Sequence, residues 1–314
     1  MTLNLNNEFF KKYKVVNLVD MHYILYRSFF AMPNLEYNGK KTGQYKGLYE
    51  LCLTLFDMFH DDKDTCTLFV ADDYPAMRKR IFPEYKETDA RKRVKDKAPV
   101  MYVDHDNFKN IIHLFPRFYF VKKTGYEADD IIQHIVLSCV EKDKTFRIYT
   151  KDYDLFYLAK RHRVMFYSGA TTAINVKEAV KKKYNTQLAK LPMIKILNGD
   201  KSDNVPPVFD LRKTRKIVEQ WLKNQKISCY NEELKARREE LKRNYLLIQP
   251  LKVKELIIEK VKNEIEALKV IHSCGLAKLL IGLNKRNLFS EETMAQHFKY
   301  NALWLMKFQE EIDG

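Results

Sequence analysis

The chain has 314 residues and carries 56 Lys or Arg against 41 Asp or Glu, which gives a formal net charge of +15. A content of 46% hydrophobic residues is enough for a full core in one large or two modest domains. No apolar stretch is long enough to cross a bilayer, the start lacks the apolar core of a secretory signal, and no GxGxxG or Walker-type GxxxxGK loop is present. We therefore expect a cytoplasmic protein with no membrane association and no nucleotide-cradling loop.

The first part of the chain alternates short apolar runs with stretches of helical periodicity. Strands are predicted at residues 13–19, 67–71, 118–121, 146–149 and 164–167. Helices are predicted between them at residues 23–32, 48–59, 108–114 and 129–140. This alternation predicts an α/β fold in which a mostly parallel central sheet carries helices on both faces.

The character of the sequence changes near Leu191, and few strand-like runs follow. An amphipathic helix is expected at residues 252–271, where apolar residues recur at helical spacing. The charge run at residues 235–243 is expected to be a solvated helix face. We predict an α/β core at residues 1–190 and a helical region at residues 191–314, within one compact structural unit.

Cysteine usage predicts reduced and mostly buried thiols. The five cysteines are odd in number and form no CxxC pair, which argues against a disulfide framework or a zinc knuckle. They are widely scattered: Cys52, Cys66, Cys139, Cys229 and Cys274.

A strongly basic segment follows the second acid-bearing strand directly. Residues 78–97 contain nine basic residues against four acids and lack a clean apolar stripe. Such a segment is either a mobile solvated loop or a clamp ordered by phosphate, and its place next to the acidic residues favours a clamp. The nine are Arg78, Lys79, Arg80, Lys86, Arg91, Lys92, Arg93, Lys95 and Lys97.

Acidic residues come at or just after the apolar runs at several places in the chain. Because ligands bind at the carboxyl ends of parallel strands, these side chains are expected to converge on one crevice. So many carboxylates would repel one another at neutral pH unless divalent cations were bound. The candidates are Asp20, Asp72, Glu127, Asp129, Asp130, Asp152, Asp154, Asp200 and Asp203.

The residue types also indicate which metal and which reaction to expect. Carboxylate oxygens without His favour Mg²⁺ over zinc, with Mn²⁺ as a substitute. Two such ions about 4 Å apart activate a water and stabilise the leaving oxygen in phosphodiester cleavage. An acidic site within a basic surface fits an enzyme that grips a polyphosphate backbone.

Five motifs, in chain order, resemble those of the 5′-nuclease family. They are VDMHYILYRSFFAM, LFVADDYPAMRKRIFPEYKETDAR, GYEADDII, IYTKDYDL and LNGDKSDNVP. The family includes the N-terminal domain of bacterial DNA polymerase I and stand-alone phage 5′–3′ exonucleases, and the absence of a polymerase-length extension is like the latter. Met21 stands where the family usually has Gly.

The resemblance implies a structure-specific 5′–3′ exonuclease or flap endonuclease that cuts DNA, or an RNA–DNA primer, near its 5′ end during replication or repair. It implies a monomer in a bacterial or phage-infected cell, with replication proteins as partners. A basic arch at about residues 78–107 would cover the site, and residues 191–314 would bind DNA. One ion would be held by Asp20, Asp72, Glu127, Asp129 and Asp152, the second by Asp154, Asp200 and Asp203, with Asp130 shared or in the outer shell.

The same resemblance assigns roles to basic and aromatic residues. Lys86 would stabilise charge on the scissile phosphate, Tyr85 would stack on a terminal base, and Arg80 would contact phosphate beside them. Further DNA contacts are implied for Arg27, Arg78, Arg91, Lys92 and Arg93. After the GDKSDN signature the family carries a Gly-rich hairpin that this chain lacks, so duplex contacts there would fall to Lys213, Arg215 and Lys216. His22 is expected to pack or hydrogen-bond and not to bind metal.

Two other functions fit the pattern less well. A PIN-type ribonuclease shares a related acidic α/β site but is usually shorter and lacks the arch and the GDxxDN segment. A catalytically silent nucleic-acid-binding scaffold would be expected to show broken acidic positions.

Overall fold

The protein is described by a computed structural model, which covers residues 2–259 apart from 5–6, 38–39, 99–103, 114, 116, 140–142, 162, 225–230, 250 and 254–255. A seven-stranded sheet with the order β1-β9-β6-β5-β2-β7-β8 lies at its centre. Five neighbouring strands are parallel: β6 (Phe118–Lys122), β5 (Thr65–Ala71), β2 (Val15–Asp20), β7 (Thr145–Tyr149) and β8 (Val164–Tyr167). β1 (Thr2–Asn4) and β9 (Ile257–Glu259) add an antiparallel edge.

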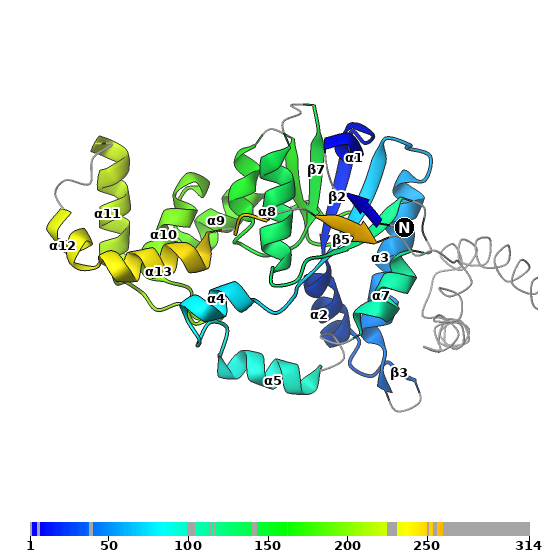
Figure 1. Ribbon diagram of the computed structural model, residues 1–314, viewed down its shortest axis with the longest axis horizontal. Helices are drawn as coiled ribbons and strands as arrows, with labels where there is room; N and C mark the ends of the chain where they lie inside the picture. The colour runs from blue at the N-terminus through cyan, green and yellow to red at the C-terminus, as the bar shows by residue number, and fades with distance from the viewer. Residues whose placement is uncertain are drawn as a thin grey trace, which may run out of the picture.

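Helices cover both faces of this sheet, as predicted (Figure 1). Alternation along the strands explains the two layers, because Leu18 and Leu68 pack into one apolar cluster while Val19 and Phe69 pack into the other. The first cluster includes residues of α1 (Asn7–Lys11), α8 (Ala128–Ser138), α9 (Val176–Tyr184) and two short 3₁₀ turns, η1 (Phe156–Lys160) and η2 (Leu188–Lys190). The second includes residues of α2 (Met21–Ala31), α3 (Gly43–Phe59) and α7 (His105–Ile112). A hairpin of β3 (Glu36–Tyr37) and β4 (Lys40–Lys41) joins α2 to α3.

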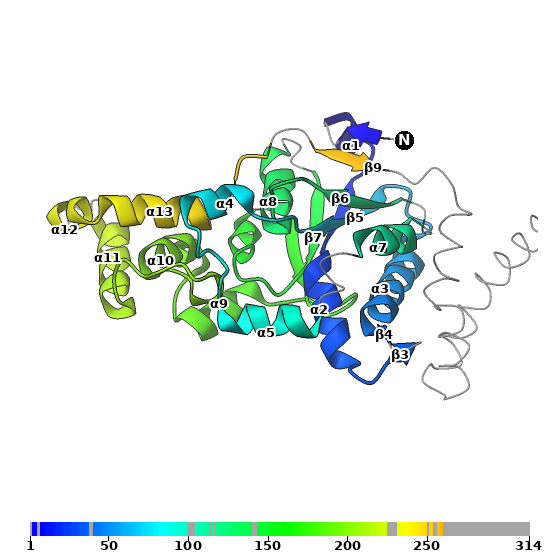
Figure 2. The same cartoon turned by 60° about the horizontal axis from the view of Figure 1, so that its bottom comes forward.

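A helical region extends from the sheet on the side away from β1 (Figures 1 and 2). It comprises α10 (Leu191–Asn198), η3 (Lys201–Asp203), α11 (Leu211–Asn224), α12 (Asn231–Ala236) and α13 (Arg238–Ile248). These helices have a small apolar cluster of their own around Ile194, Phe209 and Ile217. The division of the chain near residue 190 stays a prediction.

The basic segment forms two helices, α4 (Ala76–Ile81) and α5 (Asp89–Lys97), which run from the end of α13 toward α2 (Figures 1 and 2). Thr88 caps α5 by accepting a hydrogen bond from the Arg91 N–H, and no side chain of α5 is buried. A charged helix without an apolar face contributes little to the core, which fits a segment that acts on something outside the fold. Residues 99–103 of the predicted arch lie outside the described residues.

One predicted helix is wrong where it can be checked. Residues 257–259, expected within an amphipathic helix at 252–271, form strand β9 between β1 and β6. The open edge of β6 offers backbone partners to this β-branched run, and local periodicity does not report such a partner. Residues from 260 onward lie outside the described part of the chain.

Cys52, Cys66 and Cys139 are free and buried, as predicted. Cys229 and Cys274 lie outside the described residues. Among the helices of the described residues, none has the length and apolar composition of a membrane span.

Candidate active site

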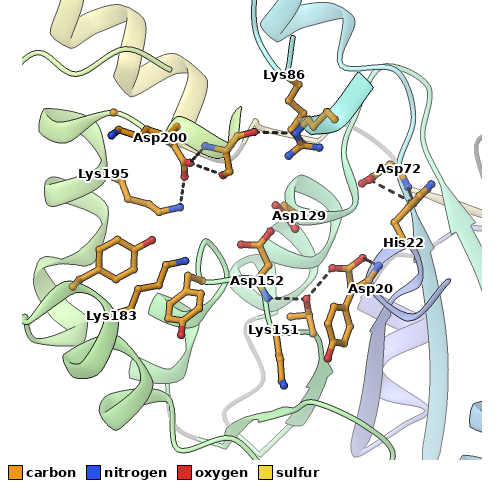
Figure 3. Close-up of a pocket in the computed structure, with 18 of the residues that line it drawn as sticks. Asp20, His22, Asp72, Lys86, Asp129, Lys151, Asp152, Lys183, Lys195 and Asp200 are labelled. Atoms are coloured by element: carbon orange, nitrogen blue, oxygen red, sulfur yellow. Dashed lines mark hydrogen bonds and ion pairs between the residues drawn. The ribbon is translucent and has the colours of Figure 1, made fainter. Parts of the chain in front are cut away.

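Four of the predicted acidic residues come together in a cleft at the carboxyl ends of the parallel strands. Asp20 is the last residue of β2, Asp72 follows β5, Asp152 follows β7, and Asp129 lies in the first turn of α8. All four line one cleft of about 670 Å³ (Figure 3). The predicted meeting of side chains from distant parts of the chain is therefore present in the fold.

Asp20 is held by hydrogen bonds at both oxygens. Its Oδ1 accepts from the backbone N–H of Tyr23 at 3.1 Å, which caps α2, and its Oδ2 accepts from Thr150 Oγ1 at 2.8 Å. Only 8% of the residue is exposed. Burial and the neighbouring charge of Asp72 raise the pKa of Asp20 to about 7.

Asp72 is fixed from two sides. Its Oδ1 accepts a 2.7 Å hydrogen bond from the N–H of Ala128 in α8, and its own N–H donates to Nδ1 of His22 at 3.2 Å. Burial would raise the pKa of Asp72, but His22, Lys86 and the Ala128 N–H together lower it. His22 thus lines the acidic cleft as a hydrogen-bonding residue.

Asp129, Asp152 and Asp154 each offer a carboxylate oxygen to one point, with these oxygens within 4.8 Å of one another. Burial and the charges of Asp152 and Asp20 raise the pKa of Asp129 well above its ordinary value. Burial also raises the pKa of Asp152. Burial and mutual repulsion disfavour the ionised form of these carboxylates, and a bound divalent cation would stabilise that form. Three oxygen donors suit a hard cation such as Mg²⁺.

Asp200 lies across the cleft, beside a lysine that the sequence analysis missed. Lys195 of α10 places its Nζ 2.7 Å from Asp200 Oδ2 and in contact with Asp154 Oδ1. Burial would raise the pKa of Asp200, but Lys195 and hydrogen bonds from Ser202 lower it to about 2. The signal in the sequence was a single lysine in the otherwise apolar run LPMIKIL, five residues before Asp200.

The turn that presents Asp200 depends on the preceding glycine. Gly199 has a φ of +69°, and a Cβ there would lie 2.3 Å from the carbonyl oxygen of Val205. Asp200 and Val205 form an isolated antiparallel bridge, with both backbone N–H groups donating across it. A side chain at position 199 would therefore displace the acidic turn.

Asp203 contacts the basic segment. Its Oδ1 lies 2.5 Å from Arg91 Nη2, and its Oδ2 is 3.1 Å from the Tyr85 hydroxyl. Lys86 contacts Glu127 Oε1 and lines the cleft together with Arg91. Burial would lower the pKa of Lys86, but Asp203 and Glu127 raise it well above its usual value, so this ammonium is charged at neutral pH.

Three predicted roles are corrected by burial, and the first two concern one ion-pair cluster. Arg78 is 4% exposed and donates to Glu127 Oε2 at 2.7 Å and to both oxygens of Asp130 at 2.6 Å, so it is not available as a DNA contact. Asp130 is fully buried by the same pairing and completes a capping box with Glu127 at the start of α8, so it is not placed to be a direct, shared metal ligand, and its place in the outer shell stays a prediction. Both carboxylate oxygens of Glu127 likewise face basic or hydroxyl partners.

Tyr85 is the third correction. Only 3% of it is exposed, and its hydroxyl lies 3.0 Å from Glu127 Oε2. The ring therefore cannot stack on a terminal base in this conformation. The chain turns inward here because the Lys86 backbone, with a φ of 61°, donates its N–H to the carbonyl of Asp203.

The remaining predicted DNA contacts lie outside the cleft, and their roles stay predictions. Arg27 donates to the carbonyl of Ser168, Lys213 pairs with Glu233 at 2.5 Å, and Arg215 donates to the carbonyl of Tyr184 at 3.2 Å. The others are exposed on α4, α5 and α11: Arg80, Lys92, Arg93 and Lys216.

The cleft also has an aromatic and basic wall that was not predicted. Tyr26, Tyr153 and Tyr184 line it, and Lys183 lies over the Tyr153 ring at 3.9 Å. Tyrosine rings and lysines around a carboxylate cluster can receive bases and phosphates. Tyr26 and Tyr153 stand within two of the quoted motifs, but the local sequence did not indicate that their rings line the cleft.

A carboxylate-lined cleft at the carboxyl ends of parallel strands, with lysines and an arginine in its wall, is typical of metal-dependent enzymes that hydrolyse phosphodiesters, the class to which nucleases belong. Residues 15–185 match the family described as 5′–3′ exonuclease, N-terminal resolvase-like domain, and the chain belongs to this family. The family predicted from the five motifs is confirmed.

Individual relatives agree with this assignment. A 5′–3′ exonuclease of Aquifex aeolicus is 28% identical over 282 residues, which cover 82% of this chain and 93% of that protein. DNA polymerase I of Pseudomonas aeruginosa is 30% identical over 195 residues, 61% of this chain but only 20% of the polymerase. The matching region thus spans about a fifth of that polymerase.

Solved structures show the same fold. T5 5′-exonuclease with zinc bound has a TM-score of 0.55 at 17% identity, with 84% of this chain and 95% of that chain covered. A bacteriophage T5 flap endonuclease, solved in a complex with DNA and metal ions, has a TM-score of 0.54 at 17% identity, with the same coverage.

Proposed function

We propose that the protein is a structure-specific 5′–3′ exonuclease and flap endonuclease that hydrolyses phosphodiester bonds near the 5′ end of DNA. The observation that carries this proposal is the convergence of Asp20, Asp72, Asp129 and Asp152 in one cleft beside Lys86. Family membership supplies the class of reaction, and the bacteriophage T5 complex with DNA supports the polymer.

The donor set fits two divalent cations, with Mg²⁺ as the physiological ion and Mn²⁺ as a substitute. Asp129, Asp152 and Asp154 would hold one ion, because their oxygens already lie close together. Asp20 and Asp72 line the same cleft and would complete the acidic set, while Asp200 and Asp203 would serve the second position. When bound, the ions would supply an activated water and charge stabilisation in phosphodiester cleavage.

The chain's own residues would position the substrate. Lys86 carries its charge into the cleft and would bind the scissile phosphate, and Arg91 would bind a neighbouring phosphate. Tyr26 and Tyr153 would stack on bases that enter beside them. The exposed basic side chains of α5 would guide a single-stranded 5′ end, and residues 191–314 would contact the duplex.

Digestion of 5′-labelled substrates tests the proposal. Full-length protein is incubated with a DNA flap, a nicked duplex, an RNA–DNA hybrid and single-stranded RNA, each with Mg²⁺, Mn²⁺ or EDTA. We expect metal-dependent release of short products from the DNA flap and nick. Cleavage of the hybrid would extend the proposal to RNA primers.

Asp152→Asn is the active-site variant. Asp61→Asn is its matched control, because the Asp61 side chain is 94% exposed. Asp152→Asn should lose at least about a thousandfold in single-turnover rate while it still binds flap DNA, because the water and leaving oxygen lose their stabilisation. Full cleavage in EDTA or by Asp152→Asn would contradict the metal assignment. Cleavage of RNA alone would indicate a ribonuclease, and binding without cleavage a silent scaffold.

A further inference from the structure

Lys195 occupies an unusual position for a lysine. It lies on α10, it is 6% exposed, and its ammonium reaches into the acidic cleft. Two carboxylates from separate segments meet there: Asp154, which follows β7, and Asp200, which follows α10. Figure 3 shows Lys195 directed toward Asp200, on the opposite side of the cleft from Asp20 and Asp72.

Lys195 joins Asp200, which is proposed for the second ion, to Asp154, whose carboxylate also faces the first. An ammonium of this kind supplies a positive charge and hydrogen-bond donors to both acids, as a cation between them would. Among the described residues, the other group shares only Asp154 with this lysine, and its remaining members, Asp129 and Asp152, form no ion pair with Lys195. The two sides of the cleft therefore differ in how directly the Lys195 ammonium contacts their carboxylates.

We propose that Lys195 is a built-in cation of the cleft, which holds Asp154 and Asp200 together in the ion-free enzyme and weakens the binding of a second divalent ion. The first ion would bind on Asp129, Asp152 and Asp154 and would be less affected, because only one of these three carboxylates contacts Lys195. The second would bind only when the ammonium withdraws, so the enzyme would load its two ions with unequal affinity. This inference rests on the proposed metal dependence of the nuclease.

The opposite expectation is that Lys195 organises the second position. A lysine that merely holds the loop would, when removed, let Asp154 and Asp200 separate, and the second ion would then bind more weakly. A competing charge predicts the reverse sign. The direction of the change in ion affinity therefore distinguishes competition from a structural role.

The experiment measures Mn²⁺ binding to the full chain without DNA. Free Mn²⁺ is followed by electron paramagnetic resonance during titration, and the melting temperature is recorded with and without Mn²⁺. Lys195→Met removes the charge and keeps an apolar stem of similar shape, whereas Lys195→Arg keeps the charge. Lys201→Met is the matched control, because Lys201 lines the same cleft but is exposed and has the same charge to lose.

We expect one tight and one weak Mn²⁺ in the unmodified protein and in Lys195→Arg. In Lys195→Met the second Mn²⁺ should bind at least about tenfold more tightly, because a unit charge beside its ligands has been removed. The stabilisation of Lys195→Met by Mn²⁺ should grow correspondingly, and this readout holds even if the ion-free variant is partly unfolded. Lys201→Met should change the second affinity much less.

Unchanged or weaker second binding in Lys195→Met would overturn the inference, and so would an equal gain in Lys201→Met. A single tight ion that Asp152→Asn abolishes, with no second ion in any variant, would overturn the inference and leave the proposed function intact. Absence of any bound Mn²⁺ would overturn both.

Discussion

Substitution of Arg78 by methionine tests whether the buried ion-pair cluster stabilises the fold or binds DNA. Arg78→Met leaves the stem but removes the guanidinium, which donates to Glu127 and Asp130 and also to the carbonyl of Leu247 at 2.9 Å. Breaking a buried ion pair by removing one partner typically costs about 3 to 5 kcal/mol.

The structure places the expected cost near the lower end of that range. Asp130 would keep hydrogen bonds from the backbone N–H groups of Glu127 at 3.2 Å and Leu251 at 2.9 Å. Glu127 would keep its contacts with Lys86 and Tyr85. We therefore expect Arg78→Met to lose about 3 kcal/mol, a large part of the stability of a typical domain.

Urea unfolding followed by circular dichroism gives the free energy of unfolding. Arg80→Met is the control, because Arg80 lies on the same helix but is exposed, and its loss should stay within about 0.5 kcal/mol. DNA binding by folded Arg78→Met should keep its salt dependence, since no phosphate contact is lost. A loss of stability below about 1 kcal/mol, or a flatter salt dependence, would refute the assignment of Arg78 to the interior.

Two further predictions concern charge. The first concerns the three basic residues at the start of α5: Arg91, Lys92 and Arg93. Neutralising all three should weaken binding to 5′ single-stranded tails and reduce the slope of log affinity against log salt by up to about 2, because each lost phosphate contact on a single strand removes about 0.7. An unchanged slope would exclude these residues as phosphate contacts. The ion-free protein should lose stability as pH rises from about 4 to about 7, because the Asp20 pKa rises from 3.8 in the unfolded chain to about 7 in the folded one, so the folded state holds the proton over this range. Asp20 would contribute at most about 4 kcal/mol to this loss, and the raised pKa values of Asp129 and Asp152 act in the same direction. Thermal melting in EDTA against pH measures the loss, and Asp20→Asn should make it smaller. A stability that increases over this range in the unmodified protein would contradict the raised pKa.

The central sheet could be predicted from the sequence because its inner strands, such as β2 and β5, are buried on both faces. Each of the five predicted strands coincides with a parallel strand, since a continuous apolar run bounded by polar residues has few other uses in a chain of this length. The helix predicted at residues 48–59 begins earlier, at Gly43, because tertiary packing buries Gln44 and Tyr45 as well. β9 was missed because its partner strand is more than a hundred residues away.

The acidic residues of the site were predictable for a related reason. A carboxylate at the end of a parallel strand reaches the cleft whatever the details of packing, as Asp20 and Asp72 do. The positions of the basic and aromatic side chains were less predictable, because the residue type does not indicate whether the backbone directs the side chain into the protein or into solvent. Arg78 and Tyr85 are buried against acids that the sequence analysis had reserved for metal.

The carbonyl of Leu247 and the N–H of Leu251 meet Arg78 and Asp130 at the start of the helix that carries Asp129. The helix that carries Asp129, a proposed metal ligand, therefore begins at a cluster that is held by backbone more than a hundred positions downstream. A shortened chain that stops at residue 190, where the sequence changes character, would keep the pairing of Arg78 with Asp130 but would remove a backbone hydrogen bond from each of these buried charges. A shortened version designed to keep nuclease activity should therefore extend at least to residue 251.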